Sequence, residues 1–151
     1  MSRARLLVCG RLVLGAVFVV AGVTKALHPA AFLLDLLQYP LAGGHFPVWV
    51  AALLPWMEIV FGGALLVNRS AQGAAMILLG LLLGFTGLVL WRAQAVHAVS
   101  GVSYLSLVLN CGCGMGPERL VVKLAENLAL AALALWLMVG PRARHGPHGT
   151  N

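Results

Sequence analysis

The chain has 151 residues, of which 61% are hydrophobic and 9% are charged, and its mean hydropathy is +0.95. Soluble domains have about 45–50% apolar and about 25% charged residues, and a chain of ~150 residues cannot bury such an excess. The composition therefore excludes a soluble globular enzyme and a disordered chain. The net charge of +6 comes from basic residues scattered at the ends of apolar runs, so we expect membrane lipids, and no nucleic acid, as partners.

Four apolar segments are long enough to cross a bilayer, which takes about 20 helical residues. They lie at about residues 6–27, 48–67, 71–91 and 120–139. Because the edges of an open sheet leave backbone groups unpaired in lipid, each segment is predicted to be a helix. The expected fold is all-α, a polytopic membrane protein whose residues 1–151 form one four-transmembrane-helix bundle.

Two longer connections separate these segments. Residues 31–37 are apolar but too short to span the membrane, which predicts a half-helix at the membrane interface. Residues 98–109 are moderately apolar but are interrupted by serine and glycine. This second stretch extends the third helix, lies in the interface or re-enters the membrane, and a fifth span is the remaining alternative.

The distribution of lysine and arginine predicts an orientation. With four spans, one side holds Arg3, Arg5, Arg11, Arg69, Arg142 and Arg144, and the other holds Lys25, Arg92, Arg119 and Lys123. Cytoplasmic segments carry the excess of positive charge. We therefore expect a protein of the bacterial plasma (inner) membrane with both termini in the cytoplasm and the loop before the last helix facing outward.

Two groups of glycines in the predicted helices indicate close helix packing. Gly15 and Gly22 lie in the first helix, and Gly80, Gly84 and Gly87 lie in the third. Glycine allows the backbones of membrane helices to approach closely. We therefore expect both groups to pack against neighbouring helices and to play no part in a functional site.

The outward loop contains a pair of cysteines, Cys111 and Cys113, separated by one glycine. Glycine tolerates the dihedral angles of a small, strained disulfide, and strained, exposed disulfides tend to be labile or catalytic. We therefore interpret the pair as redox-active. A structural staple remains an alternative, as does a Cu(I) site of Cys111, Cys113 and Met115, whose sulfur ligands are soft. Cys9 lies near the other membrane face and is assigned to packing.

A carboxylate within an apolar helix is costly, and Glu58 lies about midway along the second predicted helix. Arg11 is the cation nearest in depth at ~1.5 Å per residue. We expect Glu58 to face the bundle interior, with Arg11 or a backbone group freed by Pro55 as its partner. A structural role predicts that Glu58→Gln folds and retains function. A proton-linked role predicts a folded protein with stalled thiol turnover.

Three further charged residues are expected near the outer edge of the bundle. Lys25 and Lys123 lie in the outermost helical turns, where lysines usually extend to the lipid headgroups. Glu126 lies a turn deeper and shares a helix face with Lys123. The alternative is a group of cations that lowers the pKa of the Cys111 or Cys113 thiol.

Several short sequences together resemble one known family. They are Gly15 with Ala21-Gly22-Val23-Thr24-Lys25, His28-Pro29-x-x-Phe32, Tyr39, Leu54-Pro55-Trp56-Met57-Glu58 with Gly62-Gly63, and Cys111-Gly112-Cys113-Gly114. This combination resembles the MauE/DoxX-like redox-associated integral membrane proteins over about residues 10–140. The resemblance implies a four-helix membrane protein that works with a thioredoxin-like periplasmic partner in disulfide formation during the maturation of exported proteins.

The resemblance also implies roles for individual residues. It makes Cys111 and Cys113 the redox pair and marks Lys25 and Glu58 as family positions. The predicted function is a membrane thiol–disulfide relay, a component of thiol–disulfide oxidoreductase chemistry, in which one thiolate attacks a partner disulfide and its neighbour resolves the mixed disulfide. No bound cofactor is expected, and a quinone is one conceivable electron carrier. The alternative is a non-catalytic accessory or scaffold subunit of a larger membrane complex, for instance a respiratory one.

Overall fold

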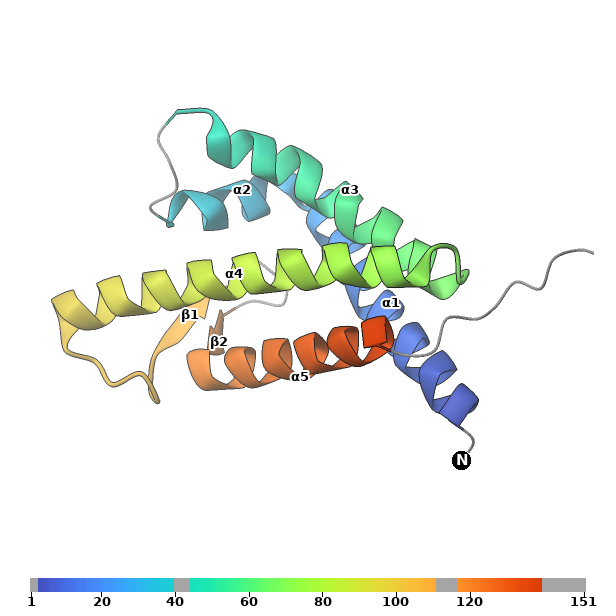
Figure 1. The fold of residues 1–151 in the computed structure, drawn as a ribbon. Coiled ribbons are helices and arrows are strands. Elements are labelled where there is room, and N and C mark those ends of the chain that lie inside the picture. The colour runs from blue at the N-terminus through green and yellow to red at the C-terminus, as the bar shows by residue number, and fades with distance from the viewer. Residues whose placement is uncertain (1–2, 40–43, 111–116, 140–151) are drawn as a thin grey trace, which may run out of the picture.

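The computed structural model describes residues 3–39, 44–110 and 117–139. Its helices are α1 (Arg3–Leu27), α2 (Pro29–Leu37), α3 (Phe46–Leu66), α4 (Ala71–Ser100) and α5 (Leu120–Val139), and its strands are β1 (Val108–Asn110) and β2 (Pro117–Arg119) (Figure 1). Within the described ranges, four helices, α1, α3, α4 and α5, are long and apolar enough to cross a membrane. The prediction of an all-α, four-span membrane fold is confirmed.

The spanning helices form two pairs. α1 packs along α3, and α4 packs along α5. The pairs converge where α3 passes into α4, which we call the turn end, and splay apart toward the end where β1 and β2 lie, which we call the strand end (Figure 1). At the strand end the two pairs therefore lie farther apart than at the turn end (Figure 1).

Glycines bring the backbones of α1 and α3 into direct contact. A Cβ atom on Gly62 would lie 2.9 Å from the carbonyl oxygen of Gly15, and one on Gly22 would lie 2.7 Å from that of Pro55. Only glycine allows these approaches. The packing prediction for Gly15 and Gly22 is confirmed, and Gly62 is their counterpart on α3.

The glycines of α4 behave differently. A Cβ atom on Gly80, Gly84 or Gly87 would meet nothing within 4 Å among the described residues. α4 packs through another face, which includes the buried side chains of Ala75 and Leu78. The prediction that the α4 glycines pack against a neighbouring helix of this chain is therefore wrong.

Two clusters of buried apolar side chains hold the bundle together. The first lies between the helix pairs and includes Leu14, Leu65 and Leu78. The second lies at the strand end and consists of Val89, Ala93, Leu107 and Leu120. The second cluster packs the segment before β1 against α4 and α5, so the strands are fixed to the bundle through apolar burial.

The third spanning helix is longer than the predicted 71–91 and continues to Ser100. It ends at Gly101, whose φ of 65° is the left-handed conformation that commonly closes a helix, and whose N–H donates to His97 O at 2.9 Å. Residues 101–110 contain no helix, so a fifth span through residues 98–109 is wrong and helix extension is right as far as Ser100.

The two short connecting elements complete the strand end. The predicted half-helix is α2, which buries Phe32 and Leu36. β1 pairs antiparallel with β2, with Val108 opposite Arg119 and Asn110 opposite Pro117. The sequence does not predict this pairing, because three-residue strands carry no alternation pattern of their own.

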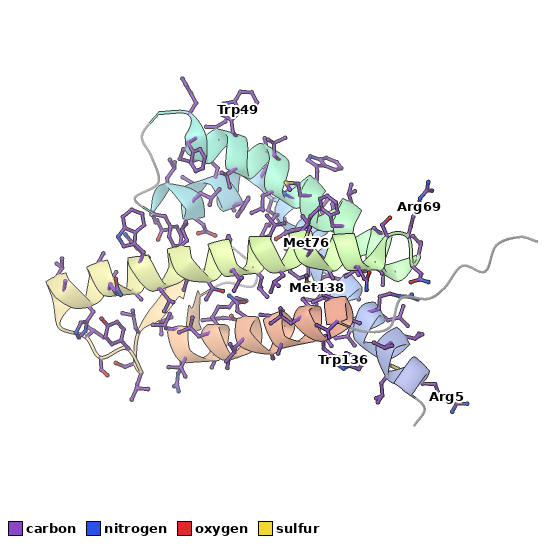
Figure 2. All side chains as sticks on the ribbon, viewed as in Figure 1. Arg5, Trp49, Arg69, Met76, Trp136 and Met138 are labelled. Carbon is purple, nitrogen blue, oxygen red and sulfur yellow. The ribbon has the colours of Figure 1, made fainter. Side chains whose placement is uncertain are left out.

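Large apolar side chains cover the outside of the bundle. Trp49 on α3 is exposed and points away from the bundle (Figure 2), and Met76 on α4 is exposed as well. A membrane-spanning bundle presents such a surface to lipid rather than to water. The chain is a multi-pass membrane protein with four candidate spans.

Candidate functional site

A buried ion pair joins α1 to α3. Lys25 Nζ donates to both carboxylate oxygens of Glu58 at 2.7 Å, and the two residues are only 4% and 6% exposed. Helical side chains lean toward the N-terminus of their own helix. Because α1 and α3 run in opposite directions, Lys25 leans into the bundle and Glu58 leans toward the strand end, and the two meet.

This pairing confirms one part of the prediction for Glu58 and corrects another. Glu58 faces the interior, as expected, but its partner is Lys25 and not Arg11 or a backbone group freed by Pro55. Gly15 lies opposite Gly62, which places Arg11 and Glu58 about two turns apart, or roughly 11 Å along the helices. The depth estimate failed because it started both helices at the same level, whereas the first turns of α3 extend beyond the end of α1.

The environment of Lys25 is aromatic as well as anionic. Its Nζ lies 5.7 Å from the ring centroid of Phe32 on α2 and 5.9 Å from that of Phe85 on α4. Both distances fall within the reach of a cation–π interaction. Lys25 therefore connects four helices, and the prediction that it extends to the lipid headgroups is wrong.

A second cluster of charged residues lies at the start of α5. Lys123 is 7% exposed, and its Nζ lies 3.2 Å from Glu126 Oε2 and 3.5 Å from Glu118 Oε2. The predicted pairing of Lys123 with Glu126 on one helix face is confirmed. The prediction that Lys123 extends to the headgroups is wrong, because these carboxylates hold it inside the bundle.

An amide next to this cluster links α5 to α4. Asn127 Nδ2 donates to Thr86 Oγ1 at 2.9 Å, and that hydroxyl donates to Leu82 O at 2.7 Å. Asn127 was not among the predicted site residues, although Lys123, Glu126 and Asn127 follow the i, i+3, i+4 spacing of one polar helix face. That spacing within an apolar helix was the available signal.

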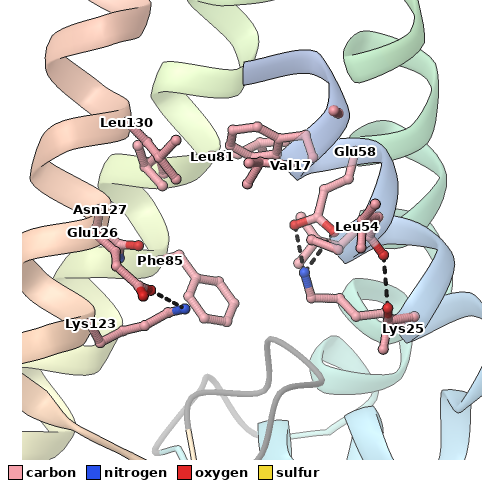
Figure 3. Close-up of a pocket in the computed structure, with 16 residues that line it drawn as sticks. Val17, Lys25, Leu54, Glu58, Leu81, Phe85, Lys123, Glu126, Asn127 and Leu130 are labelled. Atoms are coloured by element: carbon pink, nitrogen blue, oxygen red, sulfur yellow. Dashed lines mark hydrogen bonds and ion pairs between the residues drawn. The ribbon is translucent and has the colours of Figure 1, made fainter. Parts of the chain in front are cut away.

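A cavity of about 370 Å³ separates the two charged clusters, within the roughly 300–1,000 Å³ of small-molecule sites. Side chains of α1, α3, α4 and α5 line it. Figure 3 shows Lys25 and Glu58 on one wall, Lys123 and Glu126 on the other, and Phe85 between them. The remaining lining is mostly apolar, so the cavity has one charged part and one hydrocarbon part.

The charges of this site largely cancel. The ion pairs join two lysines, Lys25 and Lys123, to three glutamates, Glu58, Glu118 and Glu126. Each lysine has a carboxylate partner, as buried charges require. The site therefore has no excess of positive charge, which argues against the alternative of a cationic group that activates a thiol.

Cys111, Cys113 and Met115 lie outside the described residues, so the predicted redox pair and the alternative Cu(I) ligands have no structural account here. The residues on either side are placed. Asn110 pairs with Pro117, so the segment 111–116 begins and ends at the strand end of the bundle. Glu118, the residue after Pro117 in β2, contacts the cavity residue Lys123.

The third cysteine, Cys9, lies far from the strand end. Cys9 is near the start of α1, toward the turn end, and its side chain is exposed. The assignment of Cys9 to packing within this chain is therefore wrong, because its side chain faces the surface of the bundle.

Comparison with known families agrees with this architecture. The model of the family described as methylamine utilisation protein MauE matches residues 3–140, which include every helix that the structure describes and, in the sequence, Cys111 and Cys113. The chain belongs to the MauE family. No curated protein and no solved structure gives a further match. In this MauE-family chain, all of the charged cavity residues lie within the matched range.

Proposed function

We propose that this MauE-family protein is a membrane thiol–disulfide relay whose reactive groups are Cys111 and Cys113. The observation that carries the proposal is the attachment of the Cys-Gly-Cys segment. Paired strands hold both of its ends, and Glu118 of β2 contacts the buried charged cluster through Lys123. A short dithiol motif held at one end of a membrane bundle suits exchange with a protein partner.

The exchange needs only the sulfur atoms of the two proteins. A thiolate of a reduced partner attacks the Cys111–Cys113 disulfide, which breaks that bond and forms a mixed disulfide. The second partner thiol then attacks the mixed disulfide and leaves an oxidised partner and a reduced Cys111–Cys113 dithiol. The reaction also runs in reverse, and the relative reduction potentials set its direction.

The proposed partner is a thioredoxin-like periplasmic protein, and the proposed membrane is the bacterial plasma membrane. The orientation is supported by basic residues at the turn end, where Arg5 and Arg69 both lie (Figure 2). Because positive charge favours the cytoplasmic side, the strand end faces outward. The cysteines are then on the side where disulfides form.

Trapping of the mixed disulfide tests the proposal. In the reverse direction, one thiolate of this chain attacks the disulfide of an oxidised partner and its neighbour resolves the mixed disulfide. Cys113→Ala or Cys111→Ala leaves one thiol and removes that neighbour, and in the native host we expect one of these variants to accumulate a mixed disulfide with an exported thioredoxin-like protein. The double variant serves as the control without a reactive thiol, and Cys9→Ala is expected to behave like the unchanged protein.

The opposite result would favour the accessory-subunit alternative. If neither single variant forms a mixed disulfide, and a large membrane complex that contains this chain stays active when both cysteines are replaced by serine, the relay is contradicted. The chain would then act as a non-catalytic subunit.

A further inference from the structure

We infer that the cavity between Lys25–Glu58 and Lys123–Glu126 binds the ring of a lipid-soluble quinone. The evidence for the binding site comes only from side chains that the structure describes. The electron-transfer step that follows from it rests on the proposed relay function. The binding site and the electron-transfer step together make a membrane quinone the two-electron acceptor of the relay.

The charge of the cavity selects for a neutral ligand. Its two lysines are both held by carboxylates, so a phosphate or carboxylate headgroup would enter without an unmatched cation to bind it. Bringing another charge into this low-dielectric site is costly. A neutral molecule with polar edges avoids that cost and still interacts with the paired side chains.

The shape of the polar part suits a flat ring with a carbonyl on each side. Lys25 and Glu58 form one wall, and Lys123 and Glu126 form the opposite wall (Figure 3). Phe85 lies between them and offers an aromatic face for stacking. A quinone ring has this form, with two acceptor oxygens at opposite edges that ammonium groups recognise as hydrogen-bond acceptors.

The apolar part of the cavity opens sideways. Val17 and Val20 on α1 line the cavity and yet are 40% and 64% exposed. The apolar part therefore opens beside α1, on a surface that faces the bilayer. A ligand with a hydrocarbon tail can enter from the membrane and leave its tail in the lipid.

The electrons and protons of the step between the two thiols and the quinone balance. Two thiols and one quinone give one disulfide and one quinol, so two electrons pass from sulfur to the ring. The two protons end on the quinone oxygens, delivered by the polar side chains of the cavity. The protons that the thiols release restore those side chains.

Photoaffinity labelling tests the binding site directly. The full-length protein with Cys111 and Cys113 replaced by serine is purified in detergent and labelled with an azido-ubiquinone of short chain, with unlabelled ubiquinone-2 as competitor. We expect competable labelling on lining residues of α1, α4 and α5. Val17→Trp fills the mouth of the cavity from a partly exposed position and should weaken binding by at least about tenfold.

The matched control is Val13→Trp, one turn away on α1 and also exposed but not in the lining. It should bind within about twofold of the unchanged protein. Leu81→Trp, paired with the exposed control Leu83→Trp, repeats the comparison from α4. Equal binding in Val17→Trp and Val13→Trp, absence of competable labelling, or displacement of the quinone by phosphatidylglycerol would overturn the inference.

A second measurement separates this inference from the proposed function. Protein with both cysteines reduces ubiquinone-1 after treatment with dithiothreitol and its removal, whereas the double serine variant binds the quinone without reducing it. Binding without reduction by the cysteine-containing protein would contradict the electron transfer from the cysteines to the quinone and leave the binding site standing. Trapped mixed disulfides in a protein that binds no quinone would contradict the binding site and leave the relay standing.

Discussion

At the scale of single residues, the Lys25–Glu58 pair is a buried contact between two opposite charges. Two charges inside a membrane protein are stable only when each satisfies the other, and here both oxygens of Glu58 accept from Lys25. The identity of the partner changes what is expected of Glu58→Gln. An amide hydrogen-bonds but cannot balance the charge of a buried ammonium group.

We predict that Glu58→Gln destabilises the protein by about 3–5 kcal/mol, because it leaves the Lys25 charge uncompensated. The double variant Lys25→Met with Glu58→Leu removes both charges and should recover most of this loss. Reversible unfolding in mixed micelles measures both values. A Glu58→Gln protein as stable as the unchanged one would contradict the ion pair.

Asp35 on the interfacial helix α2 provides a pH-dependent test. Partial burial raises the pKa of this carboxyl above its ordinary value of 3.8. The folded protein then holds the proton more tightly than the unfolded chain, so this group stabilises the fold below pH 3.8, and the effect is lost as pH rises through the raised pKa.

Asp35→Asn should remove this dependence. Thermal unfolding of both proteins between pH 3 and 7, about the range in which an Asp titrates, should show a smaller loss of stability with rising pH in the variant. The difference is small because Asp35 is only half-buried. Identical pH profiles would show that burial of Asp35 does not affect folding.

At the scale of elements, the contact between α1 and α3 depends on glycine. A Cβ atom on Gly62 would lie 2.9 Å from Gly15 O and 3.1 Å from Val19 N, and neither backbone atom can move away by side-chain rotation. Gly62→Ala should therefore destabilise the protein by about 1–3 kcal/mol. The same unfolding experiment measures this change.

Gly84→Ala on α4 is the matched control. A Cβ atom there has open space around it, and alanine favours a helix over glycine by about 1 kcal/mol. We expect no loss of stability in this variant. A larger loss in Gly84→Ala than in Gly62→Ala would reverse the assignment of the two glycine groups.

The elements also show what the sequence can predict. Four spans follow from hydrophobic length, which is a property of each segment alone, and the interfacial helix α2 follows from a run too short to span. The register between two helices is not local. Glu58 was therefore matched with Arg11 by depth, whereas the offset of α1 against α3 brings it to Lys25.

The strand end was harder to predict for the same reason. Glu118 of β2 contacts Lys123 at the start of α5, and the pairing of β2 with β1 has no signature in three residues. Cys111 and Cys113 were recognisable because two cysteines around one glycine form a chemical pattern within the sequence itself. The contact of Lys123 with Glu126 within one helix was predictable, and the contact of Lys25 with Glu58 across the bundle was not.

At the scale of the whole molecule, the proposed orientation is open to direct labelling. In a background where Cys9, Cys111 and Cys113 are replaced by alanine, Ser103→Cys lies near the strand end and Ser70→Cys lies at the turn end. A membrane-impermeant maleimide added to intact spheroplasts should label the first, and should label the second only after lysis. Labelling in the opposite pattern would invert the topology.

The central claim is that Cys111 and Cys113 cycle between dithiol and disulfide, and their redox state in native membranes tests it most directly. In the Cys9→Ala protein, acid quenching followed by alkylation with a large maleimide reports the two thiols as a gel shift. We predict an unshifted disulfide form that becomes fully shifted after dithiothreitol and returns to the disulfide once the reductant is removed. Thiols that stay alkylatable throughout, or a disulfide that dithiothreitol does not open, would contradict the relay.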